Sequence, residues 1–185
     1  MTVSDPAACV QRELWGGAVT CTVPARLLDV SDMRPVPDHQ EVYADAEADQ
    51  ALIFEIVEHD AAVPDEECGR HIFQDAATGN EAASASLESV TSLGPQDAPH
   101  VQAGAYKCLV RGRQTVRRGR VPTDTDVLLA VLRLPQVQSD LVISLSTPVS
   151  TAEAAAARTE APGIMAQALG TLRVVDWDLF GGGEH

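Results

Sequence analysis

The chain alternates short apolar runs with polar turns, and most of these runs have the composition of β-strands. Strands are predicted after Gly16-Gly17 in the segment 14–24 and at 40–44, 84–93 and 105–119, and two more lie within 126–148. The last two flank the connection PQVQSD and predict a hairpin. Because both of its runs are apolar on both faces, this hairpin should lie centrally in a sheet, with helices above and below it.

Helical periodicity is found in three segments. The segment 67–79 predicts one helix, and the Ala-rich segment 151–172 predicts another that is interrupted at Pro162. The segment 50–59, QALIFEIVEH, predicts a helix with Asp49 at its N-cap, although a buried strand would also fit it.

Together these elements predict an α/β domain in which helices sandwich a sheet of about six mostly antiparallel strands. No internal repeat and no dividing linker is found, so residues 1–185 are interpreted as a single domain. Its ordered core is expected at about 12–180, with the N-terminus and the final GGGEH frayed. A chain of 185 residues, 45% of them hydrophobic, is long enough to bury such a core.

The formal net charge of −14 narrows the classes of partner. Nucleic acids and anionic membrane surfaces would repel such a protein, whereas a basic partner protein would not. The same charge serves solubility alone in many proteins. No apolar run approaches the roughly 20 residues of a membrane-spanning helix, so direct membrane insertion is not expected.

The cellular compartment is suggested by two further features. The opening MTVSDPAACVQREL lacks the basic start and long apolar run of a signal peptide. The cysteines are widely scattered at Cys9, Cys21, Cys68 and Cys108 and form no C-x-x-C pair. Both features favour a reducing, intracellular location.

No motif for catalysis or for a cofactor is present. The only lysine, Lys107, follows Tyr106, so the Gly-Lys-Ser/Thr of a phosphate-binding P-loop is absent. Cys68 and His71 have helical spacing, yet two ligands do not make a zinc site. No G-x-S-x-G elbow of a hydrolase occurs. We therefore expect no enzyme activity, no catalytic residue, no metal and no cofactor.

The chain has one basic patch, which consists of Arg111, Arg113, Arg117, Arg118 and Arg120. One interpretation is a contact for an anion or a partner. The other is an exposed strand whose charges protect it from edge pairing.

The segment 34–43, RPVPDHQEVY, carries two prolines and two carboxylates in a short turn before a predicted strand. One interpretation is structural: Asp38 caps a proline-fixed turn and Glu41 points to solvent. The other is a binding surface, since Pro35 and Pro37 limit the backbone freedom that is lost when carboxylates meet a basic partner. The residues alone leave both interpretations open.

A family resemblance bears on this choice. Five blocks carry it in order: LWGGA (14–18), RPVPDHQEVY (34–43), LIFEIVE (52–58), LLAVLRLPQVQSDLVISLSTP (128–148) and VVDWDLF (174–180). They resemble the Ran guanine-nucleotide release factor family, the Mog proteins, and together span nearly the whole chain. The patterns V-P-D-x-Q-E-V and L-R-L-x-Q-x-x-S/T-D-L-V are the most specific parts of the resemblance.

The resemblance implies the sheet sandwiched by helices that is shared with the PsbP photosystem proteins. It also implies binding to the small GTPase Ran, promotion of guanine-nucleotide release and a role in nuclear transport. The location would then be the nucleus and the cytoplasm, and the protein is expected to be a monomer. Two alternatives are a non-catalytic adaptor for a membrane or transport complex and a PsbP-like photosystem accessory protein.

The resemblance favours the binding interpretation of the segment 34–43. The partner-binding residues that it predicts are Arg34, Pro37, Asp38, Gln40 and Glu41. Asp38 and Glu41 would make charge-assisted contacts to lysine or arginine on Ran, and Gln40 would add an amide contact. Arg34 and the prolines would orient these three side chains.

Overall fold

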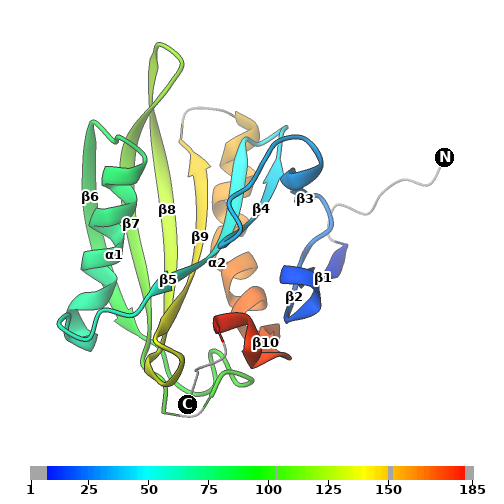
Figure 1. Cartoon of the computed structure of the whole chain (residues 1–185). Helices are drawn as coiled ribbons and strands as arrows, with labels where there is room; N and C mark the ends of the chain where they lie inside the picture. Colours follow the sequence, from blue (N-terminus) through cyan, green and yellow to red (C-terminus); the bar gives the residue numbers. More distant parts are fainter. Residues whose placement is uncertain (1–7, 103, 150–151, 182–185) are drawn as a thin grey trace.

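A computed structural model of the chain describes residues 8–102, 104–149 and 152–181, which form two antiparallel sheets and two α-helices (Figure 1). The strands of the main sheet are β3 (Leu28–Asp29), β4 (Gln40–Asp45), β5 (Gln50–Glu58), β6 (Ser84–Ser92), β7 (Lys107–Arg118), β8 (Val121–Leu134) and β9 (Ser139–Pro148). Their order across the sheet is β3-β4-β5-β9-β8-β7-β6.

A smaller sheet and two helices complete the described part of the chain. The small sheet has the order β1-β2-β10, with β1 (Cys9–Leu14), β2 (Val19–Pro24) and β10 (Arg173–Val174). The helices are α1 (Asp65–Gly79) and α2 (Ala152–Thr171), and four short 3-10 helices are η1 (Trp15–Gly17), η2 (Val30–Asp32), η3 (Pro135–Val137) and η4 (Trp177–Phe180). The segments 1–7 and 182–185, predicted to be frayed, lie outside the described residues.

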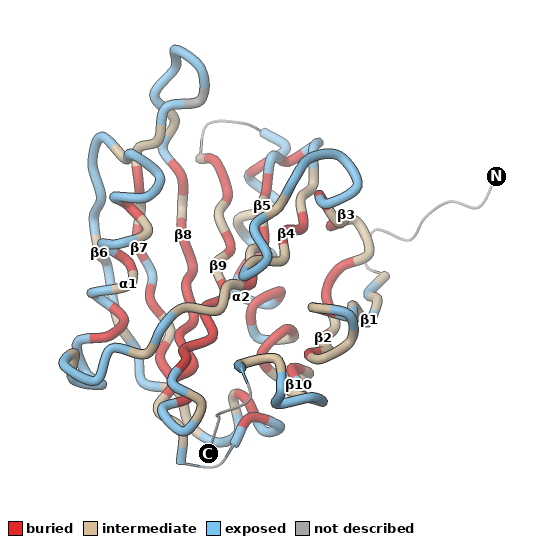
Figure 2. The backbone as a smooth tube through the Cα atoms, viewed as in Figure 1, coloured by how far each residue is buried: buried red, intermediate tan, exposed pale blue. Residues whose placement is uncertain are grey.

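Two hydrophobic cores lie on the two faces of the main sheet. On one face, α2 and the small sheet cover a cluster that includes Leu132 and Met165. On the other face, α1 packs on β6, β7 and β8 over a cluster that includes Phe73 and Leu129. Strands β8 and β9 contribute to both clusters and are largely buried along their length (Figure 2). The predicted central hairpin, covered by helices on both faces, is therefore confirmed.

The segment 50–59 is mainly a strand, so the predicted helix is wrong. Strand β5 pairs with β4 on one side and with β9 on the other. Leu52 and Phe54 are fully buried in the cluster beneath α2, whereas Ile53 lies on the opposite face. A strand with apolar side chains on both faces gives a nearly continuous apolar run, which helical spacing also matches. Asp49, predicted as an N-cap, instead has a positive φ of 54° in the turn before β5.

Helix α2 continues through Pro162, so the predicted interruption is wrong. Its buried residues form one stripe on both sides of the proline: Ala154, Ala157, Ala161, Ile164, Met165, Ala168 and Leu169. Pro162 itself is exposed, so its ring lies on the solvent side of the helix. Packing of the continuous apolar stripe outweighs the one helical hydrogen bond that proline removes.

Helix α1 approaches the sheet closely because β7 has a glycine beneath it. A Cβ atom added to Gly112 would lie 2.5 Å from Cζ of Phe73 and 2.8 Å from the backbone oxygen of Ser86. The Phe73 ring therefore occupies the space that a side chain at position 112 would need.

Candidate partner-binding site

The loop that precedes β4 is closed by backbone hydrogen bonds. The amide of Arg34 donates to the carbonyl of Val30 at 3.1 Å, and the amide of Gln40 donates to the carbonyl of Pro37 at 2.9 Å. The Asp38 side chain is exposed at the tip of the second turn, and its carboxylate has no hydrogen bond or ion pair to any described residue. Its carboxylate is therefore available to a partner and is not the cap of the turn.

Trp15 ties the N-terminal segment to this loop. Its backbone N–H donates to Oε1 of Glu41 at 2.9 Å, and its indole Nε1–H donates to the backbone carbonyl of Asp38 at 3.0 Å. Trp15, Gly16 and Gly17 have φ values of 49°, 68° and 96°, a conformation that glycine tolerates and tryptophan does not favour. The two hydrogen bonds and contact with the α2 core hold Trp15 in this conformation.

The Glu41 carboxylate is half-buried and partly engaged by the protein itself. Burial raises the pKa of Glu41 above its ordinary value of 4.5, the hydrogen bond from Trp15 lowers it, and the charge of Asp29 adds to the rise. Glu41 does not simply point to solvent, because one of its oxygens positions the Trp15 loop. The remaining acceptor capacity of the carboxylate can receive a hydrogen bond from a cationic side chain.

Arg12 is a structural residue next to Tyr43, which lies two positions after Glu41 in β4. The guanidinium of Arg12 lies 5.4 Å from the centre of the Tyr43 ring and donates to the carbonyl of Leu27 at 2.8 Å. Burial and the charge of Glu41 raise the pKa of the Tyr43 hydroxyl. A shallow depression of about 420 Å³, lined partly by Glu13 and Asp29, adjoins this pair.

We call the surface formed by Glu13, Asp29, Asp38 and Glu41 the acidic face. Glu13 and Asp29 share a depression with Arg12, and Trp15 holds the Glu41 carboxylate and the Asp38 backbone. Such a surface attracts lysine and arginine side chains of a partner.

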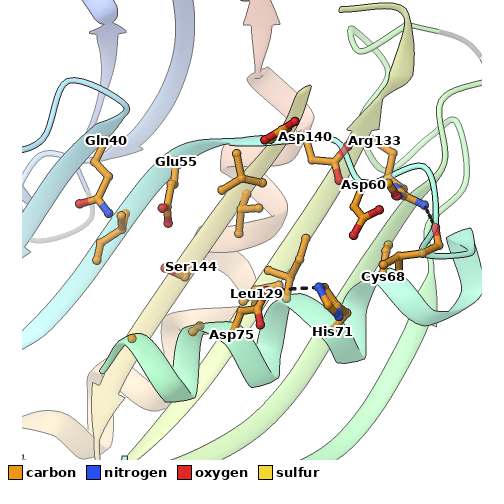
Figure 3. A pocket seen from close by; sticks show the side chains of 18 of the residues that line it. Gln40, Glu55, Asp60, Cys68, His71, Asp75, Leu129, Arg133, Asp140 and Ser144 are labelled. Atoms are coloured by element: carbon orange, nitrogen blue, oxygen red, sulfur yellow. Dashed lines mark hydrogen bonds and ion pairs between the residues drawn. The ribbon is translucent and has the colours of Figure 1, made fainter. Parts of the chain in front are cut away.

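The structure separates the five predicted site residues. Adjacent residues of a strand point to opposite faces of the sheet. Glu41 faces Trp15, whereas Gln40 lines a groove beside α1 on the opposite face (Figure 3). Asp38 and Glu41 are brought together through Trp15, and Arg34 and Pro37 are exposed in the loop before them.

Trp15 and Asp29 belong to this site and were not predicted from the sequence. The pattern Trp-Gly-Gly could have indicated a role for Trp15, because two glycines make a flexible turn that a large neighbouring side chain can hold in place. Asp29 lies before the segment 34–43, and its Oδ1 accepts a hydrogen bond from the amide of Ser31 at 2.8 Å at the start of η2. Because capping alone can explain this aspartate, no local signal indicated that it also lies beside Glu41.

The described side chains of the basic patch do not share one partner. Arg113 contacts Oδ1 of Asp126 at 2.8 Å, and Arg158 of α2 contacts Oδ2 of the same carboxylate at 2.7 Å. Arg111 is exposed. Part of the patch therefore connects β7 and β8 to α2.

Two kinds of feature are missing from the described residues. They contain no group of three or more His, Cys, Asp or Glu side chains that could hold a metal ion. Their helices include none that is long and apolar enough to cross a membrane.

Solved structures with the same architecture define the fold class. The crystal structure of the Saccharomyces cerevisiae Ran-binding protein Mog1p matches with a TM-score of 0.72 over 94% of this chain and 99% of that chain, at 22% identity. The solution structure of the cyanobacterial PsbP protein CyanoP from Synechocystis matches with a TM-score of 0.60 over 94% and 96%, at 14% identity. The protein thus has the α/β/α fold common to Mog1 and PsbP.

Sequence comparison then identifies the family. The family model of the Ran-interacting Mog1 protein matches residues 12–148. The Ran guanine nucleotide release factor of Bos taurus is 38% identical over 137 residues, 73% of this chain and 74% of that protein. The nuclear import protein MOG1 of Saccharomyces cerevisiae is 26% identical over 181 residues, 91% and 83% of the two chains. The chain belongs to the Mog1 family, and the resemblance seen in its sequence blocks is confirmed.

Proposed function

We propose that this protein binds the small GTPase Ran through the acidic face and promotes release of its guanine nucleotide, in support of nuclear protein import. Membership of the Mog1 family carries the proposal, since relatives in that family are named as Ran guanine nucleotide release factors and nuclear import proteins. The protein would act in the nucleus and the cytoplasm, and binding alone would produce the effect without bond chemistry.

The geometry of the acidic face supports this role. Asp38 offers an exposed carboxylate without a partner among the described residues, and Glu41 offers a second one fixed by Trp15. Because the Trp15 contacts hold the surrounding backbone, little conformational entropy would be lost on binding. Arg34 and Pro37 are exposed in the loop that contains Asp38, whereas Gln40 lines the groove on the opposite face of β4.

Nucleotide release follows from differential affinity. A partner shifts an equilibrium only by the difference between its affinities for the two states. If the acidic face binds nucleotide-free Ran more tightly than loaded Ran, the nucleotide must bind more weakly to the complex.

The test is release of a fluorescent guanine nucleotide from Ran, with and without the protein. Acceleration is expected, and Asp38→Lys should abolish most of it, because a repulsive charge replaces an attractive one. Asp38 is the sharper target than Glu41, since a change at Glu41 also removes the contact to Trp15. The control Glu47→Lys makes the same type of charge reversal at an exposed turn and should behave like the wild type. No acceleration and no complex with Ran at modest salt would refute the proposal.

A further inference from the structure

A groove of about 390 Å³ opens on the face of the main sheet opposite the acidic face (Figure 3). Helix α1 packs on β6, β7 and β8, and the groove runs from α1 over the neighbouring strands β9, β5 and β4. Its volume falls within the range of ~300–1,000 Å³ that is usual for binding clefts. We call it the α1 groove.

The inner surface of the α1 groove is mainly apolar, with Ser144 of β9 between Ile53 and Leu129. The apolar lining residues are Ile53 and Val57 of β5, Leu129 of β8, Val142 of β9, and Val63 and Ile72 at α1. Leu129 and Val142 also belong to the core beneath α1, so the floor continues the hydrophobic core to the surface. A ligand that covers this floor removes apolar surface from water, which contributes favourably to the free energy of binding.

The rim of the α1 groove is acidic. Glu58, Asp60 and Asp75 are exposed, and Glu55 is half-buried. Figure 3 shows Glu55 and Asp75 on opposite sides of the groove, from β5 and from α1. Each carboxylate of this pair has one histidine beside it: Nε2 of His39 lies 3.4 Å from Oε1 of Glu55, and Nε2 of His71 lies 3.3 Å from Oδ2 of Asp75. The carboxylates thus surround the apolar floor instead of forming one cluster.

The one arginine in the lining cannot neutralise this rim. Arg133 is 3% exposed, and its Nη1 donates to the carbonyl of Val63 at 2.7 Å and to Oδ1 of Asp65 at 2.9 Å. Its Nη2 donates to the carbonyl of Asp60 at 2.7 Å, and its Nε lies 3.5 Å from Oδ2 of the buried Asp140. Arg133 therefore fixes the 60–65 connection at one end of the groove, and its contacts do not include the carboxylates of Glu55, Glu58 or Asp75.

We propose that the α1 groove binds a segment of a partner protein in which one large apolar side chain is flanked by lysine or arginine. The apolar side chain would cover the floor at Ile53, and the flanking cations would meet Glu55 and Glu58 on one side and Asp75 on the other. A nucleic acid or an acidic peptide would be repelled by the same rim. A simple cation would leave the apolar floor exposed.

This site is separate from the acidic face. Gln40 and Glu41 are adjacent in β4 but lie on opposite faces of the sheet, so one strand carries a residue of each surface. The groove can be filled while the acidic face is occupied, and a partner other than Ran can use it.

A second copy of the chain is a weaker occupant. In the described part of the chain, the stretches that combine exposed basic and apolar side chains include Met33 with Arg34, and the turn between β7 and β8. Met33 is 72% exposed, but the exposed Asp32 directly before it would be repelled by the acidic rim. In the turn between β7 and β8, Arg117 and Arg120 are exposed, and Val121 is 64% exposed. Valine is small for the floor of the α1 groove, and docking of this turn would form a head-to-tail contact that need not close into a defined oligomer.

The test uses a fluorescein-labelled peptide in which one leucine lies between lysine pairs, measured by fluorescence anisotropy at low ionic strength. The wild type should bind it, and amide chemical shifts of Ile53, Glu55 and Ile72 should change in NMR spectra. The double variant Glu58→Lys, Asp75→Lys should weaken binding on the order of tenfold or more. The matched variant Glu47→Lys, Glu88→Lys changes the net charge equally at exposed positions outside the groove and should keep the affinity.

Two further comparisons separate groove binding from general attraction to an acidic protein. A peptide with serine in place of leucine should bind more weakly, and so should the original peptide to Ile53→Thr, which keeps a β-branched residue in the strand. The proposal would be overturned if both double variants lost affinity for the leucine peptide equally, or if the leucine and serine peptides bound equally well. It would also be overturned if the leucine peptide did not bind to the wild type. Self-association that both Arg120→Glu and the double variant Glu58→Lys, Asp75→Lys abolish, together with no binding of the peptide, would assign the groove to a second copy instead.

Discussion

The backbone amide of Trp15 donates a hydrogen bond of 2.9 Å to Oε1 of Glu41, which joins the N-terminal loop to the start of β4. The same tryptophan uses its indole to hold the carbonyl of Asp38. One residue of the LWGGA block thus holds the carboxylate of Glu41 and the backbone of Asp38 in the RPVPDHQEVY block. The two blocks are far apart along the chain but form a single structural unit.

Removing the acceptor at Glu41 should cost stability. Glu41→Ala leaves the amide of Trp15 without its partner and should lower the free energy of unfolding by about 1–2 kcal/mol. Glu41→Gln keeps an oxygen acceptor and should cost about half as much or less. Urea denaturation followed by circular dichroism measures both values. Equal stability of the wild type and Glu41→Ala would show that the hydrogen bond contributes nothing.

The raised pKa of Glu41 should give stability a defined pH dependence. Because its pKa is higher in the folded state than in the unfolded state, the folded protein binds more protons just above pH 4.5. The contribution of Glu41 to the free energy of unfolding should therefore fall as the pH rises from 4.5 through the raised pKa. Glu41→Gln does not titrate, so the stability of the wild type minus that of this variant should decrease over this window. A flat or increasing difference would contradict the assignment.

Gly112 should be far less tolerant of a methyl group than Gly163. Gly112→Ala places Cβ against the Phe73 ring and should destabilise the protein by about 1–3 kcal/mol through overpacking. Gly163 lies in α2, and a Cβ atom added to it would meet no neighbouring atom within 4 Å. Gly163→Ala should therefore be neutral or stabilise by up to about 1 kcal/mol. Thermal unfolding of the two variants gives the comparison, and equal effects would be inconsistent with close contact between α1 and β7.

Arg133 should be essential for stability, whereas Arg111 should not. Arg133→Met leaves Asp140 as a buried carboxylate without this cation and should cost about 3–5 kcal/mol. Arg133→Lys should also be strongly destabilising, because an ammonium cannot reproduce the forked contacts to Asp65 and to the two carbonyls. Arg111→Ala removes an exposed charge and should change stability by less than about 0.5 kcal/mol. Urea denaturation distinguishes these outcomes.

The sequence pattern predicted the fold class, the central hairpin and helix α1, because each has a strong local signal. The hairpin residues are apolar on both faces, and 67–79 has a regular helical stripe. The predicted helix at 50–59 was wrong because long-range pairing with β9 decides its conformation, and spacing along the chain does not contain that information. At Pro162, tertiary packing of the alanine stripe overrides the local preference of proline.

The candidate site was predicted only in part, for a related reason. Asp38 and Glu41 were identified from a short segment, and their roles in Ran binding stay predictions. Trp15 joins them over more than twenty intervening residues, which no local motif reports. The misassigned segment 50–59 also hid the rim of the α1 groove, since only a strand places Glu55 beside Gln40.

The alternation of Gln40 and Glu41 makes β4 sensitive to length as well as to chemistry. Pairing of Val42 with Ile53 and of Tyr43 with Leu52 fixes the register of this strand. A deletion of one residue at its start would exchange its two faces: the glutamate would turn toward α1 and the glutamine toward Trp15. The glutamate and the glutamine would both be retained, yet each would be missing from the surface it now belongs to, the acidic face or the α1 groove. Single-residue insertions and deletions at 40–42 should therefore be tolerated less well than most substitutions there.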